Sequence, residues 1–119
     1  MDIKKYKLKI KNEVVAPLKE YLKECGKDAG YNIFHVLKCK NLLTRYLNAL
    51  NKISPLLDES ILKEVKKVVL ALNALNEKTQ YCLIETDARE SIWEVIQNSA
   101  VERGLKNAEE DITEEWREW

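Results

Sequence analysis

Residues 33–50, with the sequence IFHVLKCKNLLTRYLNAL, decide the fold class of this chain. Apolar residues recur there at intervals of three and four, a period that predicts an amphipathic α-helix. The main stripe consists of Ile33, Val36, Leu37, Leu43, Leu47 and Leu50, and Cys39, Leu42, Tyr46 and Ile53 flank it. Such a wide apolar face is expected of a helix that contacts two neighbours in a bundle.

The N-terminal segment shows the same period, with apolar positions at Ile3, Tyr6, Ile10, Val14, Leu18, Tyr21 and Cys25. Residues 6–11, YKLKIK, also alternate as a strand would, but no other segment alternates and could pair with them. We therefore predict a helix. Pro17 leaves two alternatives open, because an interior proline removes a backbone donor. Either the helix bends at Pro17, or it begins near Asn12.

Several boundaries have recognisable signals. Gly26 is expected to end the first helix, and Asn32 to cap the second. Ser54 as N-cap and Pro55 at the first helical position predict the start of a third helix. A capping box of Asp87 and Glu90 predicts the start of a fourth, which is expected to end at Gly104.

The third helix presents Leu57, Ile61, Val65, Val68, Leu72 and Leu75, and the fourth presents Ile92, Trp93, Ile96 and Ala100. A last helical segment is predicted by Leu105, Ala108, Ile112, Trp116 and Trp119. Alternatively, Asp111 and Glu114 start a separate short helix there. We expect a single all-α domain over residues 1–119. Its architecture is an antiparallel up-and-down bundle of four main helices plus a short C-terminal helix. Only three Gly and two Pro are present, too few turn residues for an all-β fold.

The sequence favours a cytoplasmic protein, in a bacterial cell. It has no uninterrupted apolar run of the length a membrane span needs, and residues 1–11 do not resemble a secretory signal. Cys25, Cys39 and Cys82 are odd in number and have no paired spacing, so they do not indicate a disulfide framework.

Motifs for catalysis are absent from the sequence, and we predict no enzyme activity and no cofactor. The one alternative is a metal- or thiol-dependent enzyme centred on His35 and Cys39, which are one helical turn apart. Cys25 and Cys82 would complete a zinc site of three cysteines and one histidine. Burial of the cysteines in the core is the more ordinary explanation.

Charge is divided unevenly between the two halves of the chain. Residues 1–52 hold twelve Lys or Arg against five Asp or Glu, a net charge of +7, and residues 53–119 hold eight against fifteen, a net charge of −7. Either each half offers an interaction surface, or the halves complement one another within the bundle. Lysines at positions 4, 5, 7, 9 and 11 suggest, as an alternative function, a nucleic-acid-associated regulatory protein that uses this basic half.

The last eleven residues, EEDITEEWREW, combine six acids with two tryptophans. Tryptophan is enriched among the residues that dominate binding energy, although Trp116 would also serve to close the core. We therefore predict a non-enzymatic protein-binding module, an immunity or antitoxin-type inhibitor of a basic toxin such as a nuclease. A homodimer through an apolar helix face stays open. The predicted partner-binding residues are Glu90, Glu94, Glu110, Asp111, Glu114, Glu115, Trp116 and Trp119.

Overall fold

A computed structural model describes residues 1–54, 57–106 and 109–119 of the chain. This part of the chain is helical, with no strand, which confirms the predicted all-α fold. No helix within it is long and apolar enough to cross a membrane. In chain order the elements are α1 (Ile3–Lys9), the π-helix η1 (Ile10–Val15), α2 (Ala16–Cys25), the 3-10 helix η2 (Gly26–Ala29), α3 (Ile33–Asn51), α4 (Asp58–Lys78) and α5 (Thr86–Glu102).

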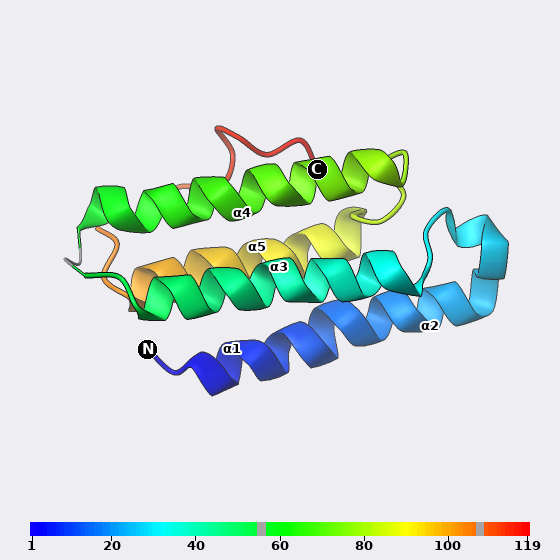
Figure 1. The fold of residues 1–119 in the computed structure, drawn as a ribbon, viewed down its shortest axis with the longest axis horizontal. Coiled ribbons are helices and arrows are strands. Elements are labelled where there is room, and N and C mark those ends of the chain that lie inside the picture. The colour runs from blue at the N-terminus through cyan, green and yellow to red at the C-terminus, as the bar shows by residue number, and fades with distance from the viewer. Residues whose placement is uncertain (55–56, 107–108) are drawn as a thin grey trace.

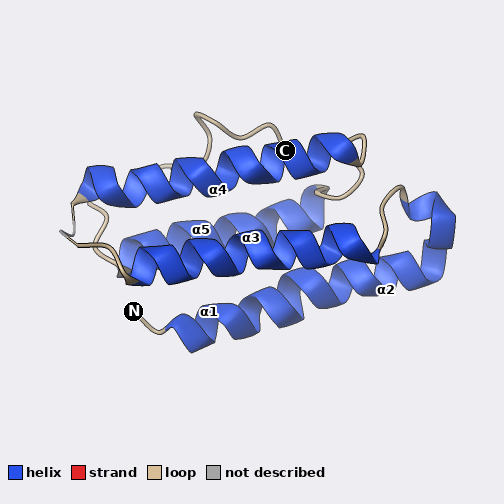
Figure 2. Cartoon of the chain, in the orientation of Figure 1, coloured by secondary structure: helices blue, strands red, loops and turns tan. Residues whose placement is uncertain are grey.

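The elements α1, η1, α2 and η2 join into one N-terminal helix of 27 residues, which packs with α3, α4 and α5 in a bundle. Successive helices run in opposite directions, as the chain colours in Figure 1 show. The N-terminal helix and α4 lie on opposite sides of the bundle, and α3 and α5 lie between them (Figures 1 and 2). The up-and-down topology predicted from the short connections is therefore present.

Pro17 neither starts nor interrupts the N-terminal helix. A turn of π-helix precedes the proline, and there the amide of Ala16 donates to the carbonyl of Lys11, five residues earlier. The wider turn fits the proline because Pro17 has no N–H to donate and its ring crowds the carbonyl of Glu13. The helix begins at Ile3, where Asp2 accepts a hydrogen bond from the amide of Lys5 at 3.2 Å.

Two of the predicted helix boundaries are confirmed. The α-helical part of the N-terminal helix ends at Cys25, and Gly26 starts the 3-10 turn η2 with a positive φ of 55° that favours glycine. Asn32 caps α3 by accepting hydrogen bonds from the amides of Phe34 and His35. The imidazole of His35 returns the bond by accepting from the amide of Asn32 at 3.1 Å.

Two predicted starts are wrong. The helix α4 begins at Asp58 after Leu57 and so does not take Ser54 as its N-cap; Pro55 lies outside the described residues. The helix α5 begins at Thr86 with no side-chain cap, so Asp87 already lies in the first turn. An acidic residue there stabilises the helix through the positive end of the helix dipole, without a capping box.

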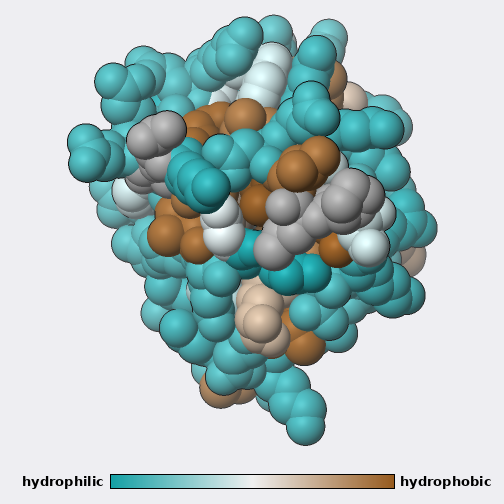
Figure 3. Space-filling model, turned by 90° about the vertical axis from the view of Figure 1, so that its left-hand side faces the viewer, coloured by the Kyte–Doolittle hydropathy of each residue, from teal (hydrophilic) through white to brown (hydrophobic). Residues whose placement is uncertain are grey.

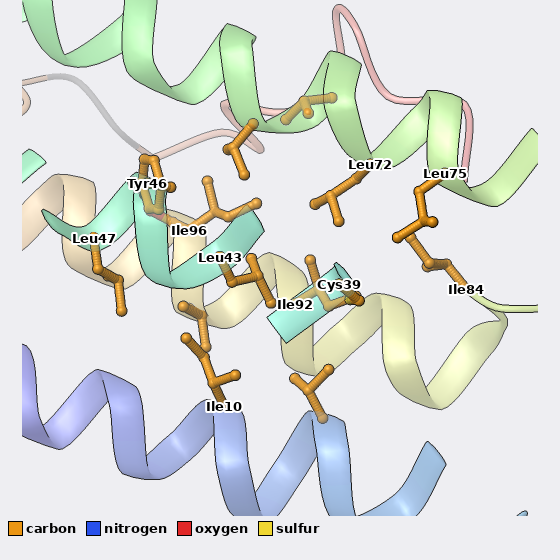
Figure 4. Close-up of a cluster of buried hydrophobic side chains, with 14 of the residues drawn as sticks. Ile10, Cys39, Leu43, Tyr46, Leu47, Leu72, Leu75, Ile84, Ile92 and Ile96 are labelled. Carbon is orange, nitrogen blue, oxygen red and sulfur yellow. Dashed lines mark hydrogen bonds between the residues drawn. The ribbon is translucent and has the colours of Figure 1, made fainter. Parts of the chain in front are cut away.

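The core occupies the space between the four helices (Figure 4). Leu43 and Leu47 of α3, Leu72 of α4 and Ile92 and Ile96 of α5 are all fully buried. Burying a side chain of this size contributes about 1.5–3 kcal/mol, so the core provides most of the stabilisation.

The connection between α4 and α5 is built around two buried polar side chains. Asn76 accepts a hydrogen bond from the amide of Ile84 at 2.9 Å, and Thr79 accepts one from the amide of Leu83 at 3.1 Å. These bonds hold Gln80 and Tyr81 at φ values of 53° and 64°. For residues other than glycine this left-handed conformation costs about 1–2 kcal/mol each. The connection is therefore tightly specified.

The other end of the bundle is tied together by an arginine. Arg103 donates from Nε to the carbonyl of Leu50 at 2.9 Å, and from Nη2 to those of Asn51 and Ile53, both at 3.3 Å. Arg103 thus bonds carbonyls at and just beyond the C-terminus of α3, where no further turn of helix supplies amide donors. Figure 3 shows this end as largely hydrophilic, with hydrophobic side chains between the polar ones.

The predicted short C-terminal helix is absent from residues 109–119, which form turns. Asp111 accepts a hydrogen bond from the amide of Thr113 at 2.9 Å, a local bond that competes with helical pairing. The amides of Ile112 and Glu118 bond to side chains of α5 and α4. Within the segment, backbone bonds are limited to turns, such as the one from the amide of Arg117 to the carbonyl of Thr113 at 2.9 Å, and tertiary contacts hold the rest. Ala108, included in the predicted stripe, lies outside the described residues.

Candidate functional site

The C-terminal segment, residues 109–119, lies along the outer side of α4 (Figure 1). Two carboxamides hold it. Asn73 of α4 donates to the carbonyl of Trp116 at 2.7 Å and accepts from the amide of Glu118 at 3.0 Å. Gln97 of α5 donates to the carbonyl of Glu110 at 3.0 Å and accepts from the amide of Ile112 at 3.1 Å. The backbone that carries the acidic residues is therefore fixed at two points.

Within the segment, Arg117 joins three groups. Its guanidinium pairs with the carboxylate of Asp111 at 2.9 Å and donates to the carbonyl of Trp119 at 3.0 Å. The same guanidinium lies 5.4 Å from the centre of the Trp119 ring. Asp111 and Trp119 are both half-buried. These two predicted partner-binding residues thus take part in the internal structure of the segment.

Trp116 packs against the core on one side and borders a surface groove on the other. Its ring lies 5.9 Å from the ammonium of Lys66 in α4. Trp116 therefore helps to close the core and stays partly exposed, and its role in partner binding stays a prediction.

A groove of about 740 Å³ runs between α4 and the C-terminal segment. We call it the acidic groove. Its floor consists of half-buried apolar side chains, and its rim of exposed carboxylates. Five carboxylates and two ammonium groups line it in all, so its charge is negative. The floor is formed by Leu62, Ile112 and Trp116, the exposed rim by Glu59, Glu110, Glu114 and Glu115, and the ammonium groups belong to Lys63 and Lys66.

Glu90 and Glu94, predicted as flanking acids, do not line the acidic groove. Glu90 is exposed on α5. Glu94 pairs with Lys9 of α1 at 3.2 Å, and Lys9 is also 3.8 Å from Glu13. At this contact the basic and acidic halves of the chain complement one another within the bundle.

The other early lysines, at positions 4, 5, 7 and 11, are exposed on the N-terminal helix. The ammonium of Lys5 lies 5.3 Å from the centre of the Tyr6 ring. The basic stretch is therefore a solvent-facing helix surface.

The residues of the metal-site alternative are not brought together. Cys39 is fully buried among apolar side chains (Figure 4), and burial raises the pKa of its thiol to about 12. His35 is half-buried and completes the cap of α3. Among the described residues no group of three or more His, Cys, Asp or Glu side chains is arranged to hold a metal ion.

Sequence reasoning did not single out Asn73 and Gln97, the residues that position the acidic segment. A signal was present in the sequence. Asn73 lies four residues after the apolar Val69, and Gln97 lies four residues after Trp93, so each is a polar residue on the apolar face of its helix. A buried carboxamide needs hydrogen-bonding partners, so each one predicts a segment docked against its helix.

No curated protein and no solved structure matches this chain in a search. A family model does match, and it covers residues 16–119, most of the chain. That stretch includes α2 to α5 and the C-terminal segment that forms the acidic groove. The chain therefore belongs to DUF5713, described as a family of unknown function.

Proposed function

We propose that this protein is a non-enzymatic binding module whose acidic groove receives a basic partner protein. In its most concrete form it is an immunity or antitoxin-type inhibitor that neutralises a basic toxin such as a nuclease. One observation carries the proposal: a groove with an apolar floor and a rim of exposed carboxylates. An apolar centre within a polar rim is the usual composition of a protein interface.

The rigid attachment of the segment supports a binding role. Asn73 and Gln97 hold the backbone on both sides of Glu114 and Glu115 before any partner arrives. Less conformational entropy is then lost on association, which favours affinity. Half-buried Trp116 offers an aromatic surface in the floor of the groove, and tryptophan is enriched among the residues that dominate binding energy.

The charges that line the groove favour one orientation of a basic partner. Lys63 and Lys66 line the groove on its α4 side, and Glu114 and Glu115 line it on the side of the C-terminal segment. A basic partner therefore places its cations against the C-terminal rim and leaves the α4 lysines at the margin. Complementary charges of this kind accelerate encounter and exclude acidic partners.

Co-purification tests the proposal directly. The chain is co-expressed with the product of its adjacent gene, and we expect the two to purify together. The variant Glu114→Lys with Glu115→Lys is expected to lose the partner. Glu20→Lys with Glu24→Lys is the matched control, because these two exposed acids of α2 lie outside the groove and the charge change is the same. Retention of the partner by the groove variant, or its loss by both variants, contradicts the proposed surface.

A further inference from the structure

A second hollow lies away from the acidic groove, between the N-terminal helix and the start of α5. Its volume is about 590 Å³, within the range of about 300–1,000 Å³ typical of small-molecule sites. The N-terminal helix, which forms one wall of the hollow, lies on the opposite side of the bundle from the C-terminal segment (Figure 1). We call it the tyrosine hollow, after Tyr21 and Tyr31 in its wall.

The two tyrosines give the hollow an aromatic wall. Their ring centres are 6.4 Å apart and the ring planes are inclined by 24°. Tyr31 is buried and donates its hydroxyl to the carbonyl of Leu18 at 2.8 Å, which fixes its ring. Tyr21 is 46% exposed, so its ring is accessible to a ligand.

Acidic side chains complete the lining, and no Lys, Arg or His is among the described residues that line the hollow. Glu13, Glu85 and Asp87 are all exposed there. Glu13 lies 3.8 Å from Lys9, but Glu85 and Asp87 form no ion pair within the described part of the chain. The positive end of α5, equivalent to about half an elementary charge, is smaller than the charge of these two carboxylates.

The negative charge of one carboxylate, Glu85, reaches both tyrosines. Burial raises the pKa of Tyr31 to about 12, and the nearby Tyr21, Cys25 and Glu85 contribute to this increase. A hydrogen bond with Cys25 raises the pKa of Tyr21, and Glu85 adds to that increase. The exposed carboxylates, with no Lys, Arg or His among the described lining residues, favour a positively charged ligand in the hollow.

The hollow is also held in shape by the α4–α5 connection. Asn76 and Thr79 fix the amides of Ile84 and Leu83. The neighbouring residues Cys82 and Glu85 both line the hollow. Cys82 closes against Gly30, where an added Cβ would lie 2.7 Å from its sulfur. The strained pair Gln80 and Tyr81 precedes this wall, and strain of this kind is concentrated at functional sites.

From the aromatic wall, the unpaired carboxylates and the absence of cations among the described lining residues, we infer that the tyrosine hollow binds a small organic cation of the alkylammonium class. The accessible ring of Tyr21, which Tyr31 supports by stacking, attracts the cationic head, and Glu85 and Asp87 balance its charge. This site is independent of the acidic groove and of the proposed partner.

An NMR titration of the full chain with choline tests the inference. Dimethylbutanol, in which carbon replaces the quaternary nitrogen, is the neutral control of the same shape. We expect saturable shifts at the amides of residues 83–91 with choline, and binding at least about tenfold weaker with dimethylbutanol. Equal binding of the two compounds, or no saturable shift with choline, overturns the inference.

Variants locate the site. Glu85→Gln with Asp87→Asn removes the two unpaired charges, and Glu85 makes no capping bond whose loss would disturb α5. This variant and Tyr21→Leu are each expected to weaken choline binding about tenfold or more. Glu114→Gln with Glu115→Gln, in the acidic groove, is expected to leave it unchanged. If choline binding responds to the groove variant and not to the hollow variants, the assigned site is wrong.

Discussion

Asn73 in α4 holds Trp116 in place by donating a hydrogen bond from its side-chain amide to the tryptophan carbonyl, 2.7 Å away. The same side chain accepts a bond from the amide of Glu118 at 3.0 Å. Asn73 is buried, so neither of its polar atoms has water as an easy substitute partner. One side chain of the bundle thus determines where the C-terminal segment lies.

Replacing this side chain should release the segment. Asn73→Ala removes two hydrogen bonds and is expected to lower the free energy of unfolding by about 1–3 kcal/mol. Hydrogen exchange of the amides in residues 112–119 should accelerate more than exchange in α3. Mass spectrometry of the exchanged protein checks this result.

Asn98→Ala is the matched control, because Asn98 is exposed on α5. Its exchange pattern should equal that of the unchanged protein. If Asn73→Ala leaves the exchange of residues 112–119 at its original rate, the two bonds do not hold the segment.

Arg103 is expected to stabilise the end of α3. Its guanidinium donates to three carbonyls, those of Leu50, Asn51 and Ile53, and no other charged side chain bonds to them among the described residues. Arg103→Met keeps the apolar stem but loses these bonds. Urea denaturation should show a loss of about 1.5–3 kcal/mol, the usual contribution of bonds to a charged group.

Arg45→Met controls for the loss of one positive charge, since Arg45 is exposed on α3. It should change the free energy of unfolding by less than about 0.5 kcal/mol. Equal effects of the two substitutions would contradict the role assigned to Arg103.

The contact between Tyr6 and Glu102 should make stability depend on pH. Tyr6 donates its hydroxyl to the Glu102 carboxylate, and this bond, with a second from the amide of Asp2, lowers the pKa of Glu102. A lowered pKa in the folded state stabilises the protein above the unfolded value of about 4.3, and this stabilisation disappears as the pH falls through the folded value.

Tyr6→Phe should therefore destabilise the protein more near pH 7 than near pH 3, because pH 3 lies below the unfolded value of about 4.3, where the stabilisation from the lowered pKa is smaller. Urea unfolding at both pH values measures the difference. In a Glu102→Gln background the effect of Tyr6→Phe should no longer vary between them. A Tyr6→Phe effect that is larger near pH 3 would contradict a lowered pKa of Glu102 in the folded protein.

The three cysteines should differ sharply in reactivity. Cys39 is fully buried and its thiol pKa is raised to about 12, whereas Cys25 and Cys82 are half-buried. Because the thiolate is the reactive form, iodoacetamide should modify Cys25 and Cys82 in the native protein and leave Cys39 intact. Peptide mass spectrometry distinguishes the three sites.

In urea all three cysteines should react. Modification of Cys39 in the native protein at the rate of Cys25 would show that the core opens more readily than the packing around Leu43 and Ile92 implies.

The helices were predictable from the sequence because apolar residues recur at intervals of three and four over long stretches. Asn32 and Gly26 were also predictable, since a side-chain cap and a positive φ depend on local chemistry. The start of α4 was not. Ser54 and Pro55 carry a strong local signal, yet the helix begins at Asp58, so the preference of one residue pair did not decide the boundary.

The candidate site was predictable only in composition. The acids and tryptophans of the C-terminal segment were visible in the sequence, but its path over α4 depends on Asn73 and Gln97, which are distant in the chain. With those contacts the segment forms turns instead of the predicted short helix. The tyrosine hollow was missed because Tyr21, Tyr31 and Glu85 belong to different parts of the chain, and no spacing relates them.

The central claim is that the acidic groove receives a basic partner, and the salt dependence of the association rate tests it most directly. Stopped-flow mixing with the partner recovered by co-expression would compare the unchanged protein with Glu114→Gln/Glu115→Gln and with the α2 control Glu20→Gln/Glu24→Gln. We predict a rate that falls steeply with added salt, and a groove variant that is about tenfold slower at low salt, while the control follows the unchanged protein. A rate that does not respond to salt, or equal rates for the two variants, would contradict the claim.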